Sequence, residues 1–297
     1  MDVLRTPEAR FEGLPDYDFA PHYAQVAGMR LHYVDEGPRQ AAPVLCMHGE
    51  PTWSYLYRNM IPVFTGAGYR CVAPDLIGFG KSDKPVLRED YTYQSHVDWM
   101  AAWLDAVDLT GITLVCQDWG GLIGLRLLAA MPERFARLVV ANTALPTGDQ
   151  PMGAAFEGWR AYSQSVEVFD AGRIVYGGTT SKITPQEVAA FNAPYPDASY
   201  QAGARQFPML VPSTPDDPAA PANRSAWKVL EGLDLPVLTA FGADDKIMAG
   251  VDGVFQRRMK GAAGQPHTVL PGAGHFLQED VGPELAALVV EWMGAVG

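Results

Sequence analysis

The segment spanning residues 112–124 constrains the fold more than any other part of the chain. It reads Ile-Thr-Leu-Val-Cys-Gln-Asp-Trp-Gly-Gly-Leu-Ile-Gly, and its β-branched apolar run stops at Asp118. Small residues lie on both sides of Asp118, at Cys116, Gly120 and Gly121, and a helical pattern follows. A sharp strand-to-helix turn needs small neighbours if it is to lift one side chain clear of the sheet. The segment therefore predicts that Asp118 is either a nucleophile on such a turn or merely the cap of the following helix.

Apolar, strand-like runs alternate with longer helical patterns along most of the chain. This rhythm is typical of a mainly parallel sheet with crossover helices, so we expect an α/β fold with an eight-stranded sheet flanked by helices. The expected strands are an N-terminal hairpin at 22–26 and 29–34, followed by 44–47, 70–73, 112–117, 138–142, 237–241 and 268–270. Polar residues follow nearly every strand, at the edge where sites form in parallel sheets.

The stretch from Pro146 to Ser225 breaks this rhythm. It is rich in proline, aromatic residues and alanine, and its periodicity is helical where it has any, notably at 185–191 and 198–206. We interpret residues 146–225 as a helical cap inserted between two strands. Residues 1–145 and 226–297 would then form the core domain.

Composition excludes several classes of partner. The formal net charge is -12, and 22 scattered basic residues face 34 acidic ones, so neither nucleic acid nor an anionic membrane is an expected partner. No apolar stretch is long enough for a membrane span or resembles a signal peptide. The cysteines, Cys46, Cys71 and Cys116, lie inside apolar runs and are expected to be buried free thiols. We therefore expect a cytoplasmic protein.

Two further groups lie downstream of Asp118 in an order typical of one fold. The run 271–276 ends the last expected strand with His275 in a glycine-rich loop. Asp244 and Asp245 follow the strand before it, and only one of them can face His275; we favour Asp245, and Asp244 stays the alternative. Nucleophile, acid and histidine in this chain order are typical of the α/β-hydrolase fold.

Two other histidines are not favoured as the base. His267 begins the last expected strand, which places it at the wrong end of the sheet. His48 lies in the His48-Gly49 turn and is expected to be structural. No spacing of His, Cys and acidic residues suggests a metal site, and we expect neither a metal nor a cofactor.

Together with several short runs, these residues make the chain resemble the haloalkane dehalogenases, in particular the subfamily with an Asp-His-Asp triad and two halide-binding tryptophans. The matching runs are 48–55 (HGEPTWSY), 78–85 (GFGKSDKP), 117–121 (QDWGG), 272–276 (GAGHF) and, in the expected cap, 195–203 (YPDASYQAG). The resemblance implies that Asp118 is the nucleophile, His275 the base and Asp245 the acid that orients it. A related subfamily takes its acid after an earlier strand, where this chain has Asn142, and this difference favours Asp245.

The resemblance also implies how an oxyanion and a halide would be bound. Glu50 and Trp119 would supply backbone donors to the oxyanion hole. Trp119 would be one halide-binding indole and a cap tryptophan the other, for which we choose Trp159. The remaining tryptophans are expected to be core or surface aromatics, namely Trp53, Trp99, Trp103, Trp227 and Trp292.

A carboxylate nucleophile suits attack on a saturated carbon. An ordinary aspartate titrates near ~3.9 and needs no base to activate it at neutral pH. Attack by Asp118 would release halide and leave an alkyl ester, which water activated by His275 would hydrolyse to an alcohol. Two indole N–H groups suit the leaving halide because tryptophan donates and does not accept. We therefore expect small haloalkanes as substrates, with water as co-substrate, and a monomer.

Two other functions remain open on the sequence. An epoxide hydrolase would share the Asp nucleophile and would need cap tyrosines as acids, for which the candidates are Tyr162, Tyr176, Tyr195 and Tyr200. The run 50–53 and Gln117 speak against it, since epoxide hydrolases usually carry His at the latter position. A catalytically inactive binding protein on the same fold would be expected to lack a triad member, and none is missing.

Overall fold

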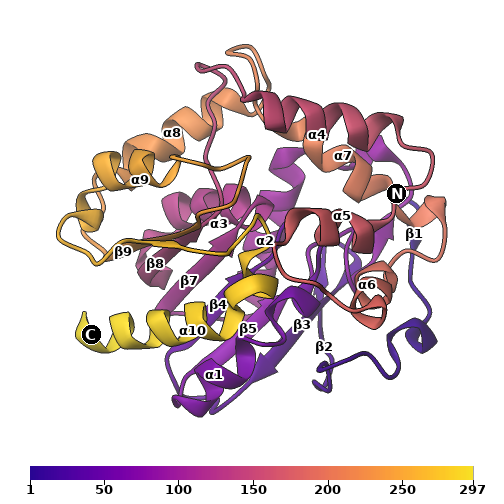
Figure 1. Ribbon diagram of the computed structural model, residues 1–297, viewed down its shortest axis with the longest axis horizontal. Helices are drawn as coiled ribbons and strands as arrows, with labels where there is room; N and C mark the ends of the chain where they lie inside the picture. The colour runs from indigo at the N-terminus through magenta and orange to yellow at the C-terminus, as the bar shows by residue number, and fades with distance from the viewer. Residues whose placement is uncertain (297) are drawn as a thin grey trace.

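An eight-stranded sheet forms the centre of the molecule, and the computed structural model describes residues 1–296 (Figure 1). The strand order is β10-β9-β8-β7-β4-β5-β3-β2. The strands are β2 (His22–Val26), β3 (Met29–Glu36), β4 (Pro43–Met47), β5 (Arg70–Pro74), β7 (Ile112–Gln117), β8 (Phe135–Ala141), β9 (Val237–Gly242) and β10 (Thr268–Leu270). These match the expected strands, and the prediction of an α/β fold with a mostly parallel eight-stranded sheet is confirmed.

The pairing of the strands brings the chemically active residues to one edge. Strands β4, β5, β7, β8, β9 and β10 pair in parallel, while β2 and β3 pair antiparallel and β3 runs antiparallel to β5. The carboxyl ends of the parallel strands therefore share one edge of the sheet. A separate two-stranded sheet joins β1 (Val3–Leu4) to β6 (Lys84–Pro85).

Most strand ends lie within two residues of the prediction, and the largest difference is in β8. Strand β8 begins at Phe135 and ends at Ala141, whereas the sequence predicts 138–142. Asn142 has φ 40° and so leaves the extended conformation. This turn directs the Asn142 side chain toward the neighbouring strand instead of continuing the ladder.

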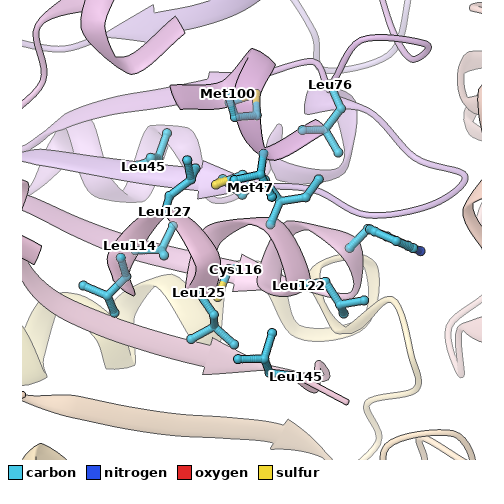
Figure 2. Packing of buried hydrophobic residues seen from close by; sticks show 14 of the residues in the cluster. Leu45, Met47, Leu76, Met100, Leu114, Cys116, Leu122, Leu125, Leu127 and Leu145 are labelled. Atoms are coloured by element: carbon cyan, nitrogen blue, oxygen red, sulfur yellow. The ribbon is translucent and has the colours of Figure 1, made fainter. Parts of the chain in front are cut away.

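Helices cover both faces of the sheet. Helix α1 (Ile61–Gly66) and helix α10 (Leu277–Ala295) pack together on one face, and α2 (Tyr93–Val107), α3 (Trp119–Ala130), α8 (Ala220–Leu230) and α9 (Asp252–Arg258) lie on the other (Figure 1). Alternate residues of a strand face opposite sides. In β4, Leu45 and Met47 accordingly pack with α2 and α3, while Val44 and Cys46 pack on the side of α1 and α10. Figure 2 shows the first of these layers, with Leu125 of α3 near Cys116 of β7.

Four further helices lie between β8 and β9 in sequence. They are α4 (Ala154–Ser165), α5 (Ala171–Gly178), α6 (Pro185–Asn192) and α7 (Ala202–Leu210), and they gather beyond one edge of the sheet (Figure 1). The helix predicted at 185–191 is α6. The helix predicted at 198–206 is instead a short 3-10 helix, Ala198–Tyr200, followed by α7, because Gln201 breaks the helical path at φ -103° and ψ 7°.

Helix α8 runs through the predicted end of the cap. It spans Ala220–Leu230, on both sides of residue 225, and packs against α3 of the core. The Trp227 indole donates to the Leu145 carbonyl at 2.8 Å, which ties α8 to the segment that follows β8. The part of this region that lies over the sheet edge is therefore α4 to α7.

Two global features follow from the described chain. Within residues 1–296, no helix combines the length and apolar character needed to cross a membrane. The same residues contain no cluster of His, Cys and acidic side chains placed to hold a metal ion. Cys46, Cys71 and Cys116 are buried free thiols, as predicted.

Candidate active site

Asp118 sits on a strained turn between β7 and α3. Its φ of 49° and ψ of -127° are unusual for a residue with a side chain, and such strain clusters at functional sites. A Cβ on Gly120 would lie 2.0 Å from the Met47 carbonyl oxygen, and one on Gly121 would lie 2.1 Å from Thr143 Oγ1. Within the described chain the Asp118 side chain makes no hydrogen bond to the N–H groups of α3. The alternative that Asp118 caps this helix is therefore wrong.

The two carboxylate oxygens of Asp118 have different surroundings. Oδ1 accepts a hydrogen bond from the Glu50 backbone N–H at 2.7 Å. Oδ2 lies 3.6 Å from His275 Nε2. A Cβ on Gly49 would lie 2.2 Å from Oδ1, so the close approach of this backbone requires glycine. One oxygen is thus held by a backbone donor while the other faces the imidazole.

His275 is held in turn by Asp245. Its Nδ1–H donates to Asp245 Oδ2 at 2.8 Å, while Asp245 Oδ1 accepts from the N–H groups of Ile247 at 2.8 Å and Met248 at 3.2 Å. Asp244 is exposed. Burial favours the neutral acid, but His275 and the two N–H groups outweigh it and lower the pKa of Asp245. The structure therefore brings Asp118, His275 and Asp245 into one line and leaves Asp244 outside it.

Two carboxylates flank the imidazole of His275. Burial alone would lower the pKa of His275, but the charges of Asp245 and Asp118 outweigh it and raise this pKa to about 10. The imidazolium is therefore the favoured form while both carboxylates are ionised.

The loop carrying His275 is anchored to the sheet by two amide side chains. Asn142 Nδ2 donates to the carbonyls of Gly274 at 2.7 Å and His275 at 3.1 Å, and its Oδ1 accepts from the Gly242 N–H at 2.8 Å. Gln117 Nε2 also donates to the His275 carbonyl, at 3.1 Å. This anchoring role is absent from the sequence predictions. The signal available for it is a polar residue at the end of each of two adjacent strands.

A cavity of about 390 Å³ lies over these groups. Its lining includes Asp118, Glu50 and His275 from the core and Trp159, Phe156 and Ile174 from the cap. Apolar surface with few polar groups is typical of a site for a small apolar ligand. The predicted halide ligands Trp119 and Trp159 both line this cavity.

Trp119 and Trp159 are the two tryptophans that line the cavity. Trp119 is buried and stacks on Phe207, with ring centroids 4.3 Å apart. Neither Trp119 nor Trp159 donates its indole N–H to an acceptor within residues 1–296, so both donors are available to a ligand. The other five tryptophans are buried and lie away from the cavity, as predicted; they are Trp53, Trp99, Trp103, Trp227 and Trp292.

The side chain of Glu50 is a feature that the sequence predictions miss. Burial, with the charge of Asp118 as a second cause, raises the pKa of the Glu50 carboxyl well above its usual range. Its Oε1 is buried and has no hydrogen-bond partner among the described residues. The neutral acid is therefore favoured at this wall of the cavity.

His48 has the structural role expected of it. Its Nδ1–H donates to the Gly49 carbonyl at 2.9 Å, and its Nε2 accepts from the Leu76 N–H at 3.0 Å. Both ring nitrogens are thus occupied by backbone groups, which holds the turn beside Asp118 in place.

The cap tyrosines do not form a pair of acids over Asp118. Tyr162 lines the cavity, but the residue is 47% exposed. Tyr195 is buried, and its hydroxyl donates to the Pro51 carbonyl at 3.4 Å. Tyr176 and Tyr200 lie outside the cavity lining. The arrangement needed by an epoxide hydrolase with two tyrosine acids is therefore not assembled by these four residues.

The chain is similar to known proteins over its whole length. Residues 42–280 match the family model of the alpha/beta hydrolase fold. A haloalkane dehalogenase of Psychrobacter cryohalolentis is 54% identical over 99% of this chain and 98% of its own length. One from Mycolicibacterium paratuberculosis is 52% identical over 100% of both chains.

A solved structure gives the same result. The structure of a tetrameric haloalkane dehalogenase from Paraglaciecola agarilytica superposes with a TM-score of 0.89 at 35% identity, covering 97% of each chain. These matches set aside the epoxide hydrolase and the inactive binding protein. The chain therefore belongs to the haloalkane dehalogenases, hydrolases of the α/β-hydrolase fold that act on carbon–halide bonds.

Proposed function

We propose that the protein hydrolyses small haloalkanes in two steps, through an alkyl ester on Asp118. The observation that carries this proposal is the asymmetric setting of the Asp118 carboxylate. Its Oδ1 is bound by the Glu50 N–H at 2.7 Å, and its Oδ2 faces His275 at 3.6 Å in a cavity lined by two indoles. A cavity of about 390 Å³ suits a short alkyl chain.

In the first step Asp118 displaces the halide. Oδ2 attacks the carbon that bears the halogen, a C–O bond forms, and the C–X bond breaks with its electron pair on the halide. The N–H groups of Trp119 and Trp159 stabilise this anion as its charge develops. No proton moves in this step, so His275 is not needed for it.

The second step hydrolyses the ester. Alkylation removes the charge of Asp118, which is one of the groups that raise the pKa of His275. This pKa therefore falls once the ester forms, and the imidazole loses its proton and becomes available as a base. His275 takes a proton from water, and the hydroxide attacks Cγ of Asp118. The Cγ–O bond to the alkyl group then breaks, and the alkoxide takes a proton from His275 and leaves as the alcohol. The new carboxyl group of Asp118 loses the proton of the attacking hydroxide, which restores the carboxylate and completes the release of one H⁺ per halide.

The oxyanion formed in this step needs donors at Oδ1. The Glu50 N–H is already in place there. The Trp119 N–H, at the first residue of α3, is one of the N–H groups that a helix leaves unpaired at its start. We assign it as the second donor. Each such donor contributes roughly 3 kcal/mol in comparable acyl chemistry.

A single turnover in ¹⁸O-labelled water tests the route. With enzyme in excess over 1-bromobutane, the first butanol should contain the unlabelled oxygen of Asp118, and the label should enter the Asp118 carboxylate. Mass spectrometry of the alcohol and of the Asp118 peptide measures both. Labelled butanol in the first turnover would show direct attack of water on the substrate and would refute the ester intermediate.

Substitution of Trp159 tests the second halide donor. Trp159→Phe removes one N–H from the cavity and keeps an aromatic ring, so halide dissociation constants should rise about tenfold or more. Quenching of tryptophan fluorescence by bromide measures this affinity. Trp292→Phe is the matched control. Trp292 lies away from the cavity, and its indole donates to Gln265 at 2.8 Å. Equal bromide affinities in the two variants would place the second donor elsewhere.

The division of the chain into cap and core is a further proposal. We propose that residues 146–225 form the cap and that 1–145 and 226–297 form the core. Helix α8 connects the two, since it starts inside the cap range and packs on α3. The cap contributes most of the apolar wall of the cavity, so we expect it to determine the preferred chain length.

We further infer a cytoplasmic monomer. Asp118, His275, Asp245 and the cavity lining all come from one chain, so the site needs no second copy. Cys46 Sγ and Cys71 Sγ lie 3.8 Å apart as free thiols, which suits a reducing compartment. Light scattering should give 32.2 kDa. A mass near four times that value would instead match the tetrameric relative from Paraglaciecola agarilytica.

A further inference from the structure

The Asp280 carboxylate joins the cap to the loop that carries His275. Its Oδ1 accepts from the N–H groups of Thr180 at 2.9 Å and Ser181 at 2.7 Å. Its Oδ2 accepts from the Thr180 N–H at 3.1 Å and from the Gly274 N–H at 2.7 Å. One carboxylate near the start of α10 thus binds two backbone groups that follow α5 and one that directly precedes His275.

The cap segment also contacts His275 directly. The Gly178 carbonyl, at the end of α5, accepts from the His275 N–H at 2.7 Å and from the Phe276 N–H at 3.4 Å. A Cβ on Gly178 would lie 2.7 Å from the Phe276 ring, and one on Gly274 would lie 2.4 Å from the Gly178 oxygen. The two segments are therefore in van der Waals contact with no room for side chains between them.

His275 is consequently held from two sides. Asn142 and Gln117 donate to its carbonyl from the sheet. Gly178, positioned through Asp280, accepts its N–H from the cap. The same helix α5 lines the cavity with Ile174, Gly177 and Gly178. The cap wall and the base thus share one set of contacts.

We propose that Asp280 is a positioning residue for ester hydrolysis, acting by fixing the His275 loop against cap residues 178–181. This proposal rests on the assignment of His275 as the base. The Asp280 carboxylate is suited to this role because it only accepts hydrogen bonds, and all three of its partners are N–H donors. An amide in its place would offer one acceptor oxygen, and its NH₂ group would face a donor.

Asp280→Asn should therefore slow the second step more than the first. Alkylation does not use His275 and should change by less than about threefold, while ester hydrolysis should fall roughly tenfold to a hundredfold, since small displacements of a catalytic group have effects of this size. The fraction of Asp118 that carries the butyl group during turnover of 1-bromobutane should rise accordingly. A loss of general stability would lower both rates together and would not produce this split.

Rapid-quench measurement of bromide, with mass spectrometry of the Asp118 peptide, resolves the two steps. Glu284→Gln is the matched control, because Glu284 is an exposed acid on the same helix. Thr180→Val is a second variant, which acts from the cap side. It removes the hydrogen bond that the Thr180 hydroxyl donates to the Gly272 carbonyl. It keeps the proposal testable if Asp280→Asn does not fold, and it should cause the same split in milder form.

The outcomes separate this proposal from the assignment of His275. If His275→Gln accumulates the ester and Asp280→Asn behaves like Glu284→Gln, the positioning role of Asp280 is overturned, whatever the result for Thr180→Val. An equal loss in both steps overturns it as well. If His275→Gln itself accumulates no ester, the proposed mechanism fails first.

Discussion

Replacement of His275 by glutamine is expected to stop the enzyme after the halide has left. Alkylation of Asp118 moves no proton, so one equivalent of bromide should be released from 1-bromobutane at close to the normal rate. Steady-state turnover should then fall by about 10⁴-fold, the upper range for the loss of a general base. The butyl ester should persist on Asp118 because no other base within the described chain contacts Oδ2.

Mass spectrometry of the peptide containing Asp118 measures the trapped ester, and a bromide burst measures its rate of formation. His22→Gln is a matched control, since His22 lies on β2 at the edge of the sheet. It should turn over normally. An unmodified Asp118 peptide in His275→Gln, together with full loss of bromide release, contradicts the two-step route.

Replacement of Asp245 by asparagine should have an effect of nearly the same size. The N–H groups of Ile247 and Met248 occupy the position of Oδ1, so they should retain the amide oxygen there. The NH₂ group is then directed at His275 Nδ1, which currently donates to Oδ2 at 2.8 Å. Nδ1 must become the acceptor and Nε2 must carry the proton, which is the wrong tautomer for a base facing Asp118. A tautomer change of this kind lowers turnover by about 10⁴-fold in a serine protease triad.

The pH behaviour of Asp245→Asn gives an independent readout. The charge of Asp245 is one of the groups that raise the pKa of His275 to about 10. Its removal should lower that pKa, so His275 should lose its proton at a lower pH than in the wild-type protein. NMR titration of labelled histidine, assigned with His275→Gln, measures the shift. Asp244→Asn is the control, since Asp244 is exposed, and an unchanged His275 pKa in Asp245→Asn would contradict the pairing.

Much of the fold can be predicted from the sequence because the strands are locally encoded. Five-residue apolar runs such as β4, with residues buried on both sides, indicate strands covered by helices on both faces. The turn at Asp118 can be predicted for a similar reason, since its small residues Gly120 and Gly121 are visible in the sequence. The structure shows why they are needed: a Cβ would lie only 2.0 Å from the nearest atom at Gly120 and 2.1 Å at Gly121. The break at Gln201 within the predicted helix at 198–206 could not be predicted, because helical periodicity continues through it.

The site was predictable only in part. The small residues around Asp118, the glycine-rich loop around His275 and the chain order of the two select them from the sequence, because the fold brings the carboxyl ends of its parallel strands to one edge. The anchoring of His275 by Asn142, Gln117 and Asp280 depends on which backbone groups meet across loops distant in sequence. The hydrophobic periodicity of the sequence carries no information about such contacts.

Residues 112–124 predict an aspartate on a sharp turn between a buried strand and a helix, because Cys116, Gly120 and Gly121 are small enough to let the turn close. Which of the two adjacent carboxylates faces His275 depends on the folded backbone, and the sequence leaves Asp244 and Asp245 as alternatives. Asp245 turns inward because the backbone that follows it presents two N–H groups to its Oδ1, while Asp244 remains in solvent. The position of Trp159 at the cavity likewise depends on contacts between distant segments, since α4 packs on α7 within the cap and α7 packs on β6 of the core.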